Sequence, residues 1–293
     1  MGLFLVLLLL SNLLRAFRLH IILQSGQTYL RTFHVCNIGN LTNSILPLRA
    51  GEFCMAALLA KDLPGGGGEA LSKLLADRLI DLLTVAVFFL GALLFLIPPG
   101  HAAQREMHAA LAIAMSLGAI CALLLAALAL ESSLVRLVQA AGRGLGRNAD
   151  GIIAALRAGI EGLRCLFRKR IFSHALLLSL AIWLVVAATF FVGMLMFGLP
   201  PQFAGAILAM CFTVAGLVAL PLPAGVGTTH GAIVIALMLF GVEFEQALAY
   251  AIAYHALNTG LNIALGLLGL KALRLNLAGL RRIVATGISG PPQ

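Results

Sequence analysis

Long, uninterrupted apolar segments constrain the fold of this chain more than any other feature of its sequence. Four of them cover residues 79–97, 109–130, 171–197 and 247–270. Each reaches the roughly 20 residues that a helix needs to cross the hydrocarbon core of a bilayer. A fifth segment, Gly2 to Leu14, is shorter and has no basic residue before it, unlike a secretory signal. We expect it to remain in the protein as a further span.

The composition agrees with a chain that lies in lipid. Of its 293 residues, 61% are hydrophobic and 11% are charged, which leaves too little polar surface to cover a soluble globule. The net charge of +9 fits membrane topology and contact with anionic lipid better than a nucleic-acid partner, which we do not expect.

The scattered cysteines lack the spacing of a zinc site or a disulfide framework, and we expect no metal and no cofactor. They are Cys36, Cys54, Cys121, Cys165 and Cys211.

Basic residues predict the orientation. The segment 131–170 holds far more Lys and Arg than Asp and Glu, and the tail 271–293 is also basic. The positive-inside rule therefore places both in the cytoplasm of a bacterial cell, with the protein in the inner membrane and its N-terminus outside. The apolar residues of 148–167 recur at helical spacing, which predicts an amphipathic helix on the inner membrane surface or against the bundle.

A six-residue motif occurs twice, as LPLRAG in Leu46–Gly51 and as LPLPAG in Leu220–Gly225. Because proline lacks an amide donor and glycine weakens a helix, each copy is expected to break a helix at membrane depth and to form a re-entrant hairpin. The charge-derived topology makes the two hairpins enter from opposite sides, as an inverted repeat. The alternative is that the motif only marks loops between ordinary spans. The flanking segments are 28–46 and 51–62 in the first copy and 203–220 and 229–241 in the second.

The predicted fold is an all-α integral membrane protein with about five full transmembrane helices plus two re-entrant helical hairpins in an inverted repeat. We expect residues 1–293 to form one domain. Its parts are a first repeat at about 1–97, a linking span with the basic cytoplasmic segment at about 98–170, a second repeat at about 171–270 and a cytoplasmic tail at 271–293.

Charged and polar residues around the first motif are candidate site residues. A charged side chain at the bilayer centre costs about 2.5–3.5 kcal/mol even on the lenient insertion scale, so Arg49 and Glu52 are expected to have a function there. Arg49 is suited to bind a lipid phosphate, and Glu52 to hold or release that arginine; a loop ion pair at the interface is the alternative. Asn37, Asn40 and Ser44 share one helix face and either line an access path or join helices by hydrogen bonds.

Three charges open the following span. Asp77 and Asp81 lie one helical turn apart, and Arg78 is close to Asp81 on the same helix. This pattern predicts a network of ion pairs that hold one another in place within the membrane. The alternative is an interfacial cap whose arginine extends toward water.

The second motif continues into a glycine-rich helix start. Backbone amides there would face an anion, which suits a phosphate-bearing substrate, although no nucleotide-binding pattern accompanies them. His230 and His255 are isolated histidines in apolar surroundings. Hydrolase and transferase motifs are missing from the sequence, so we expect no enzymatic activity. The candidates in this half are Gly225, Gly227, Thr228, Thr229, His230 and His255.

Taken together, these elements resemble the lysylphosphatidylglycerol synthase transmembrane region family, the flippase-like domain of multiple peptide resistance factor proteins and their stand-alone relatives. The resemblance is nearly full length and implies lipid translocation without identifying the lipid. Relatives fused to a transferase domain make and flip aminoacylated phosphatidylglycerol, and others are linked to isoprenoid, hopanoid or glycolipid pathways. The matching elements are Arg15 to Arg18, Asn43 with Pro47 to Glu52, Asp77 to Asp81, and Pro221 to Thr228.

The chain departs from the family pattern at several positions. Family members usually have one more span before the Arg15 element. Met55 stands where arginine is common, Asp77 where glutamate is common, His230 where glutamate is common and His255 where arginine is common. If the last two family positions form an ion pair, the two histidines replace it with a hydrogen-bonded, pH-sensitive pair.

The sequence therefore predicts a flippase that moves an anionic or phosphate-bearing lipid across the inner membrane, with the hairpin tips meeting near the midplane. Expected partners are the lipid substrate, the anionic lipid surface at the basic loop, and a second copy of the chain or a lipid-biosynthetic enzyme. The alternatives are a membrane enzyme that acts on lipid phosphate, with Glu52 or Asp81 as base, and a non-transporting partner of a lipid-modifying enzyme.

Overall fold

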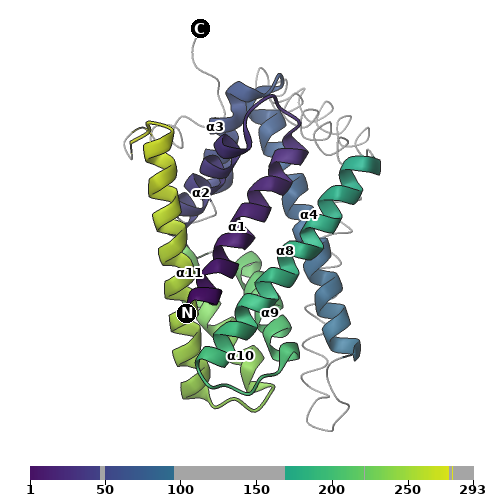
Figure 1. Ribbon diagram of the computed structural model, residues 1–293, viewed down its shortest axis with the longest axis vertical. Helices are drawn as coiled ribbons and strands as arrows, with labels where there is room; N and C mark the ends of the chain where they lie inside the picture. Colours follow the sequence, from purple (N-terminus) through teal and green to yellow (C-terminus); the bar gives the residue numbers. More distant parts are fainter. Residues whose placement is uncertain (47–49, 96–168, 221, 277–278, 280–293) are drawn as a thin grey trace, which may run out of the picture.

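A computed structural model of the chain describes residues 1–46, 50–95, 169–220, 222–276 and 279, and the regular secondary structure in these ranges is helical (Figure 1). The predicted span 109–130, the predicted amphipathic helix 148–167 and Arg49 lie outside the described residues. The elements in chain order are α1 (Gly2–Leu23), α2 (Tyr29–Ile45), α3 (Gly51–Leu59), η1 (Ala60–Asp62), α4 (Gly66–Phe95), α8 (Lys169–Met196), α9 (Phe203–Ala219), η2 (Pro223–Gly225), α10 (Thr228–Met238) and α11 (Phe244–Ala272).

Three described helices are long and apolar enough to cross a membrane: α1, the Ile171–Met196 part of α8, and α11. The last two contain the predicted spans 171–197 and 247–270 almost completely. Helix α4 begins at Gly66, well before the apolar segment 79–97, so its first turns carry charged residues. The protein is therefore an all-helical membrane protein, and the predicted total of about five spans includes one segment that is not described.

The first apolar segment was predicted to end at Leu14, and this boundary is wrong. Helix α1 continues to Leu23 and ends at Gln24, whose φ of 48° is left-handed. Arg15 and Arg18 lie inside the helix rather than in a loop beyond it. The helix continues because acidic side chains of α4 neutralise these arginines, as described below.

Helices are interrupted at both copies of the repeated motif. At the first copy, α2 ends at Ile45 and α3 begins at Gly51. The Asn43 side chain closes this turn: its Oδ1 accepts a hydrogen bond from the Gly51 amide at 2.7 Å and its Nδ2 donates to Glu52 Oε2 at 3.3 Å. At the second copy, α9 ends at Ala219 and α10 begins at Thr228.

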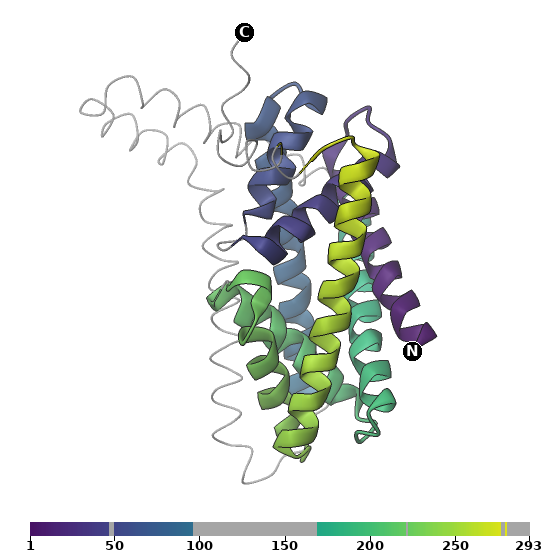
Figure 2. The same ribbon diagram turned by 90° about the vertical axis from the view of Figure 1, so that its left-hand side faces the viewer.

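The two helix pairs that these breaks create lie toward opposite ends of the molecule, with α2 and α3 at one end and α9 and α10 at the other (Figures 1 and 2). The members of each pair pack against each other, and α2 also contacts the η2 turn of the second pair. The long helix α11 runs beside both pairs (Figure 2).

Helices α11 and α2 approach closely through glycine. A side chain on Gly266 would meet Leu41 and would lie 2.8 Å from the Asn37 carbonyl oxygen, and one on Gly269 would lie 2.9 Å from the His34 carbonyl oxygen. Small residues permit this kind of backbone approach between membrane helices. The contact holds one wall of the cavity described next.

Candidate functional site

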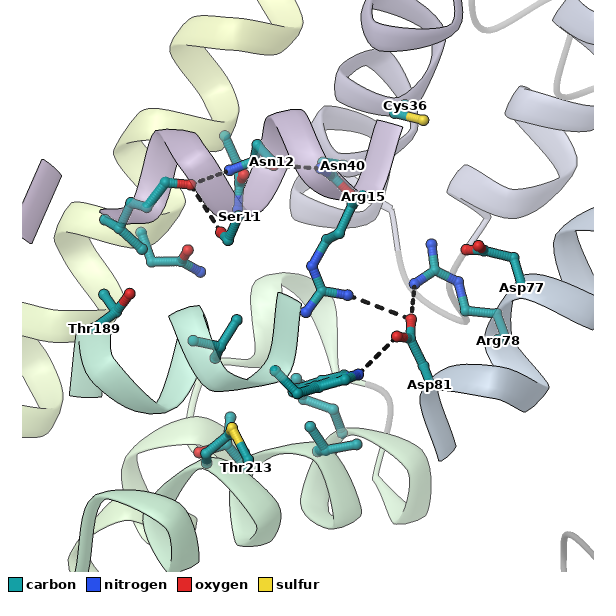
Figure 3. Close-up of a pocket in the computed structure, with 18 of the residues that line it drawn as sticks. Ser11, Asn12, Arg15, Cys36, Asn40, Asp77, Arg78, Asp81, Thr189 and Thr213 are labelled. Carbon is teal, nitrogen blue, oxygen red and sulfur yellow. Dashed lines mark hydrogen bonds and ion pairs between the residues drawn. The ribbon is translucent and has the colours of Figure 1, made fainter. Parts of the chain in front are cut away.

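A cavity of about 360 Å³ lies inside the helical bundle (Figure 3). This volume falls in the range of about 300–1,000 Å³ that is typical of ligand sites. Its lining comes from α1, α2, α3, α4, α8, α9 and α11, so it joins segments from both halves of the chain. The polar lining residues are Ser11, Asn12, Arg15, Cys36, Asn40, Asp77, Arg78, Asp81, Thr189, Thr213, Asn258 and Asn262.

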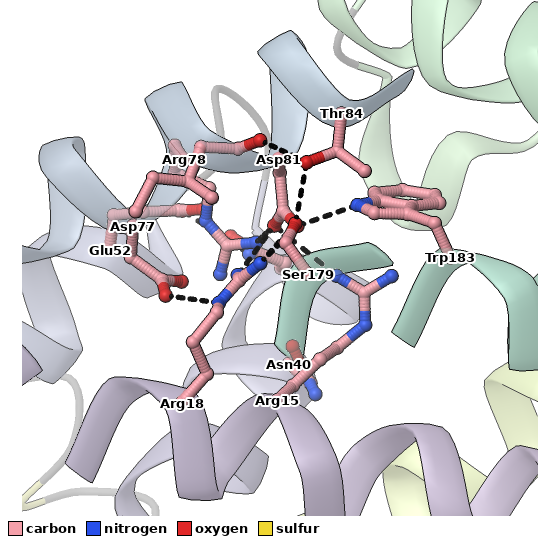
Figure 4. Close-up of polar contacts among 12 residues, drawn as sticks. Arg15, Arg18, Asn40, Glu52, Asp77, Arg78, Asp81, Thr84, Ser179 and Trp183 are labelled. Carbon is pink, nitrogen blue, oxygen red and sulfur yellow. Dashed lines mark hydrogen bonds and ion pairs between the residues drawn. The ribbon is translucent and has the colours of Figure 1, made fainter. Parts of the chain in front are cut away.

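Arg18 forms the centre of a buried ionic network beside the cavity (Figure 4). Its Nε donates to Asp77 Oδ1 at 2.8 Å, and its two terminal nitrogens donate to Asp81 Oδ1 at 2.6 Å and Asp81 Oδ2 at 2.9 Å. One of those nitrogens also donates to Ser179 Oγ at 2.9 Å. The residue is 0% exposed, and such a buried guanidinium is tolerated because each acidic partner is charged and well aligned. The network joins α1, α4 and α8.

Asp81 receives two further arginines from the cavity side. Arg15 Nη1 lies 3.3 Å and Arg78 Nη1 lies 3.4 Å from Asp81 Oδ2, and Figure 3 shows both guanidinium groups converging on this carboxylate. Trp183 Nε1 donates to the other oxygen at 2.7 Å, and the Arg15 guanidinium lies 4.6 Å from the centre of the Trp183 ring. The Arg15 and Arg78 side chains are 26% and 32% exposed, whereas that of Arg18 is 1% exposed.

The predicted residues Glu52, Arg78 and Asp81 are brought together. Arg78 lies between the two acids, with its Nε 3.6 Å from Glu52 Oε1 and its Nη1 3.4 Å from Asp81. The Nε atom is buried and has no hydrogen-bond partner among the described residues. Both contacts are long for a charge-assisted hydrogen bond, so Arg78 retains donor capacity for a ligand. Glu52 contacts Arg78 without lining the cavity itself.

Asn40 also lies where the sequence predicted a polar path, because it lines the cavity and its Nδ2 donates to Asn12 Oδ1 of α1 at 3.4 Å. Asn40 therefore joins α2 to α1 by a hydrogen bond and also lines the cavity, and its part in an access path stays a prediction. Asn37 and Ser44 do not line the cavity, since their side chains bond to the carbonyl oxygens of Phe33 and Asn40 on their own helix.

The candidates of the second hairpin are not brought into this cavity. The residues of this half that line it belong to α8, α9 and α11, and Gly225, Gly227, Thr228, Thr229, His230 and His255 are not among them. The predicted backbone anion site at Gly225 to Thr229 is also reduced by the geometry of the turn. Its first three amides donate within the protein, to the Leu222 and Pro223 carbonyl oxygens and to His230 Nδ1.

The two histidines are in contact, as the paired departure from the family pattern predicted. His255 Nδ1 lies 2.9 Å from His230 Nε2, and His255 Nε2 lies 2.9 Å from the Ala224 carbonyl oxygen. The Gly227 amide donates to His230 Nδ1 at 3.3 Å, so His230 carries its proton on Nε2 and donates it to His255. The chain of bonds holds the η2 turn, where Ala224 adopts a left-handed φ of 53°, against α11.

Several residues of the cavity and the network were missed by the sequence reasoning as site residues: Arg15, Arg18, Trp183, Asn258 and Asn262. The two arginines entered only through the family resemblance, because the first apolar segment was expected to end at Leu14. Their presence within an apolar helix is the signal that would have found them, since such charges mark functional positions. Asn258 and Asn262 share a face of α11 at a spacing of four residues, a weaker signal of the same kind.

Within the residues that the structure describes, no group of three or more His, Cys, Asp or Glu side chains is arranged to hold a metal ion. The described cysteines Cys36, Cys54 and Cys211 are free.

Comparison with protein families identifies one match. The family model described as the lysylphosphatidylglycerol synthase TM region matches residues 1–266. Comparisons with curated proteins and with solved structures give no match. The family match covers most of the chain and includes every residue of the cavity and of the buried ionic network. This membrane protein therefore belongs to the lysylphosphatidylglycerol synthase TM region family.

Proposed function

We propose that this protein is a lipid flippase of the bacterial inner membrane, which moves the head group of an anionic or phosphate-bearing lipid through the cavity while the acyl tails remain in the bilayer. The observation that carries the proposal is the pair of partly exposed arginines, Arg15 and Arg78, at the wall of a polar cavity within an apolar helical bundle. Family membership supports a lipid-related role.

The arginines have two different roles. Arg18 stabilises the structure, whereas Arg15 and Arg78 have N–H donors that can bind a ligand. Arg18 donates short hydrogen bonds to Asp77 and to both oxygens of Asp81, and it is completely buried. Arg15 and Arg78 have longer contacts with Asp81 Oδ2, which also accepts from Arg18 at 2.9 Å. A guanidinium group carries five N–H donors, which match the oxygens of a phosphate in bidentate geometry. A phosphate can therefore bind Arg15 and Arg78 while Arg18 keeps the network intact.

Helix breaks on both sides of the bundle support alternating access. Discontinuous helices related by an inverted repeat surround the substrate site in many transporters, and one repeat then moves against the other. The α2–α3 and α9–α10 pairs have the order of elements that such a repeat requires, and α2 contacts η2. We propose that these pairs are re-entrant hairpins that admit the head group from opposite sides. Arg49, which lies between α2 and α3 in the sequence, is proposed as an additional phosphate ligand.

The rival enzymatic function requires Glu52 or Asp81 to act as a base. Asp81 accepts hydrogen bonds from Arg15, Arg18, Arg78 and Trp183, so both of its oxygens are already occupied by donors of the protein. The geometry therefore favours binding over proton abstraction at this carboxylate.

The decisive experiment is lipid translocation in proteoliposomes made with a native lipid extract. Wild type is compared with Arg15→Gln, with Arg49→Ala and with the control Arg31→Gln. Arg31 has a similarly exposed side chain (33%) and pairs with Asp62 outside the cavity. Loss of a charge-assisted hydrogen bond of about 1.5–3 kcal/mol predicts a decrease of roughly 10- to 100-fold for Arg15→Gln. The control should retain the wild-type rate.

Wild-type protein that is folded but moves no lipid, with or without a pH gradient, would contradict the proposal. Chemical change of the lipid would then support the enzyme, and an inert protein would support a non-transporting partner role.

A further inference from the structure

Two carboxamides of α11 have hydrogen-bonding groups that the described residues leave open. Asn258 and Asn262 line the cavity, and neither side chain forms a hydrogen bond to another described residue. The hydroxyls of Ser11, Thr189 and Thr213 behave differently, since they donate to carbonyl oxygens of their own helices at 2.8, 2.8 and 2.7 Å. The polar groups that α11 adds to the cavity wall are therefore these two amides and the hydroxyl of Tyr254.

These amides share one face of α11, because residues four apart in a helix lie one above the other. Tyr254 precedes them by one further turn on the same face and also lines the cavity. Its ring stacks on Phe190 with a centroid distance of 4.1 Å, which fixes this part of the wall. The face thus presents two successive amide groups to the cavity that also contains Arg15 and Arg78.

An amide side chain offers two N–H donors and an oxygen with two lone pairs. Hydroxyl groups both donate and accept, so a hydroxylated head group can use both parts of each amide. An ammonium group instead requires a carboxylate or several acceptors. Asp77 and Asp81, the carboxylates that line the described part of the cavity, already bind arginine. The cavity therefore provides cations for a phosphate and neutral amides beside them, without an open carboxylate for an amine.

We propose that the transported lipid carries an uncharged, hydroxylated group, such as glycerol or a sugar, on its phosphate, and that Asn258 and Asn262 recognise its hydroxyls. This inference rests on the proposed function and narrows its substrate. Lipids with an ammonium group, including ethanolamine and aminoacylated lipids, are poor ligands. The volume of about 360 Å³ suits a head group without its acyl chains.

The test measures binding of short-chain lipids with identical dihexanoyl tails to the purified protein in detergent, by isothermal titration calorimetry. Phosphatidylglycerol and phosphatidylmethanol carry the same charge, but only the first has free hydroxyls; phosphatidylethanolamine carries an amine. Two hydrogen bonds between neutral groups, each of about 1 kcal/mol, predict that wild type binds phosphatidylglycerol roughly tenfold or more tightly than phosphatidylmethanol. Phosphatidylethanolamine should bind most weakly.

The double variant Asn258→Leu and Asn262→Leu should lose the preference for phosphatidylglycerol and keep the wild-type affinity for phosphatidylmethanol. Gln246→Leu is the matched control, because it removes an exposed amide of the same helix outside the cavity. Equal affinity of wild type for the two anionic lipids, or a preference for phosphatidylethanolamine, would overturn the inference, and this result does not require the variant to fold. Binding that is absent, or unaffected by Arg15→Gln, would instead overturn the proposed function.

Discussion

Replacing Arg18 with methionine tests whether the ionic network holds α1 in the bundle. Methionine fills much of the space of the arginine stem without its charge or its five donors. The change removes the hydrogen bonds of 2.6–2.9 Å to Asp77, Asp81 and Ser179. Asp81 keeps contacts with other arginines, and Ser179 Oγ still accepts from Thr84 at 2.9 Å.

The energetic cost is therefore concentrated at Asp77, which is 4% exposed and has Arg18 as its ion-pair partner in the described part of the chain. Removal of one member of a buried pair costs about 3–5 kcal/mol, because the other charge stays buried without compensation. We expect a decrease of this size in the free energy of unfolding of Arg18→Met. Adding Asp77→Asn removes the stranded charge, so the double variant should be at least about 1 kcal/mol more stable than Arg18→Met alone.

Unfolding in mixed micelles of a mild detergent and sodium dodecyl sulfate provides the assay. Trp183 is the one tryptophan of the sequence, and its Nε1 donates to Asp81, so its fluorescence reports directly on the network. A loss of less than about 1 kcal/mol for Arg18→Met would refute the reasoning, since surface ion pairs have effects of that size. A double variant less stable than the single one would show that Asp77 does not bear the cost.

Three further predictions follow from contacts elsewhere in the bundle. Gly266→Val should destabilise the protein by about 1–3 kcal/mol because the new side chain meets α2, whereas Gly260→Ala, where the added methyl meets open space, should have no destabilising effect; equal melting temperatures would contradict this. Lys73→Met should cost about 1–3 kcal/mol in the same unfolding assay, because Lys73 Nζ is buried and donates to a carbonyl oxygen of α1 at 2.5 Å; a smaller loss would show that this bond is unimportant. Acidification from pH 7.5 to 5.5 should lower the melting temperature of wild type more than that of His255→Phe, because a proton added to His230 Nδ1 turns the acceptor of the Gly227 amide into a donor while His230 Nε2 is held by His255; parallel changes would argue against it.

A second pH effect lies outside the apolar segments. Burial raises the pKa of the Glu69 carboxyl, but hydrogen bonds from Lys73 and the Gly65 amide outweigh it, so the pKa lies below its usual value. A carboxyl whose pKa is lowered on folding adds stability above its unfolded pKa, and this stability is lost as the pH falls through the folded value. This contribution is therefore constant between pH 7.5 and 5.5 and does not disturb the histidine comparison.

Hydropathy predicted where α8 and α11 lie because their apolar segments are long and their charges are few. It failed at the end of α1, since a hydropathy window treats Arg15 and Arg18 as hydrated charges. The acids that neutralise Arg18 are 59 and 63 residues away in the sequence, so only the fold reveals that this helix can continue.

Contacts between residues far apart in the sequence also limited the prediction of the site. Asp77, Arg78 and Asp81 were recognised as a network because they are neighbours on one helix face. Trp183 joins Asp81 across 102 residues, and no local pattern predicts this contact. At the glycine-rich turn, the sequence predicted a site that the structure does not leave available. The composition of the turn suggested free amides, but the amides of Gly225 and Gly227 donate to groups of the turn itself and of the following helix.

Under the proposed function, the different roles of the arginines would allow a charged site both to persist in an apolar bundle and to exchange a ligand. A single arginine that held the helices together and also bound the phosphate would have to break structural bonds in every cycle, at a cost of several kcal/mol. Here Arg18 has short bonds and no exposure, whereas Arg15 and Arg78 share one oxygen through longer contacts. Binding of the proposed lipid phosphate would therefore redirect Arg15 and Arg78 while the bonds of Arg18 remain, which would keep the barrier to ligand release low.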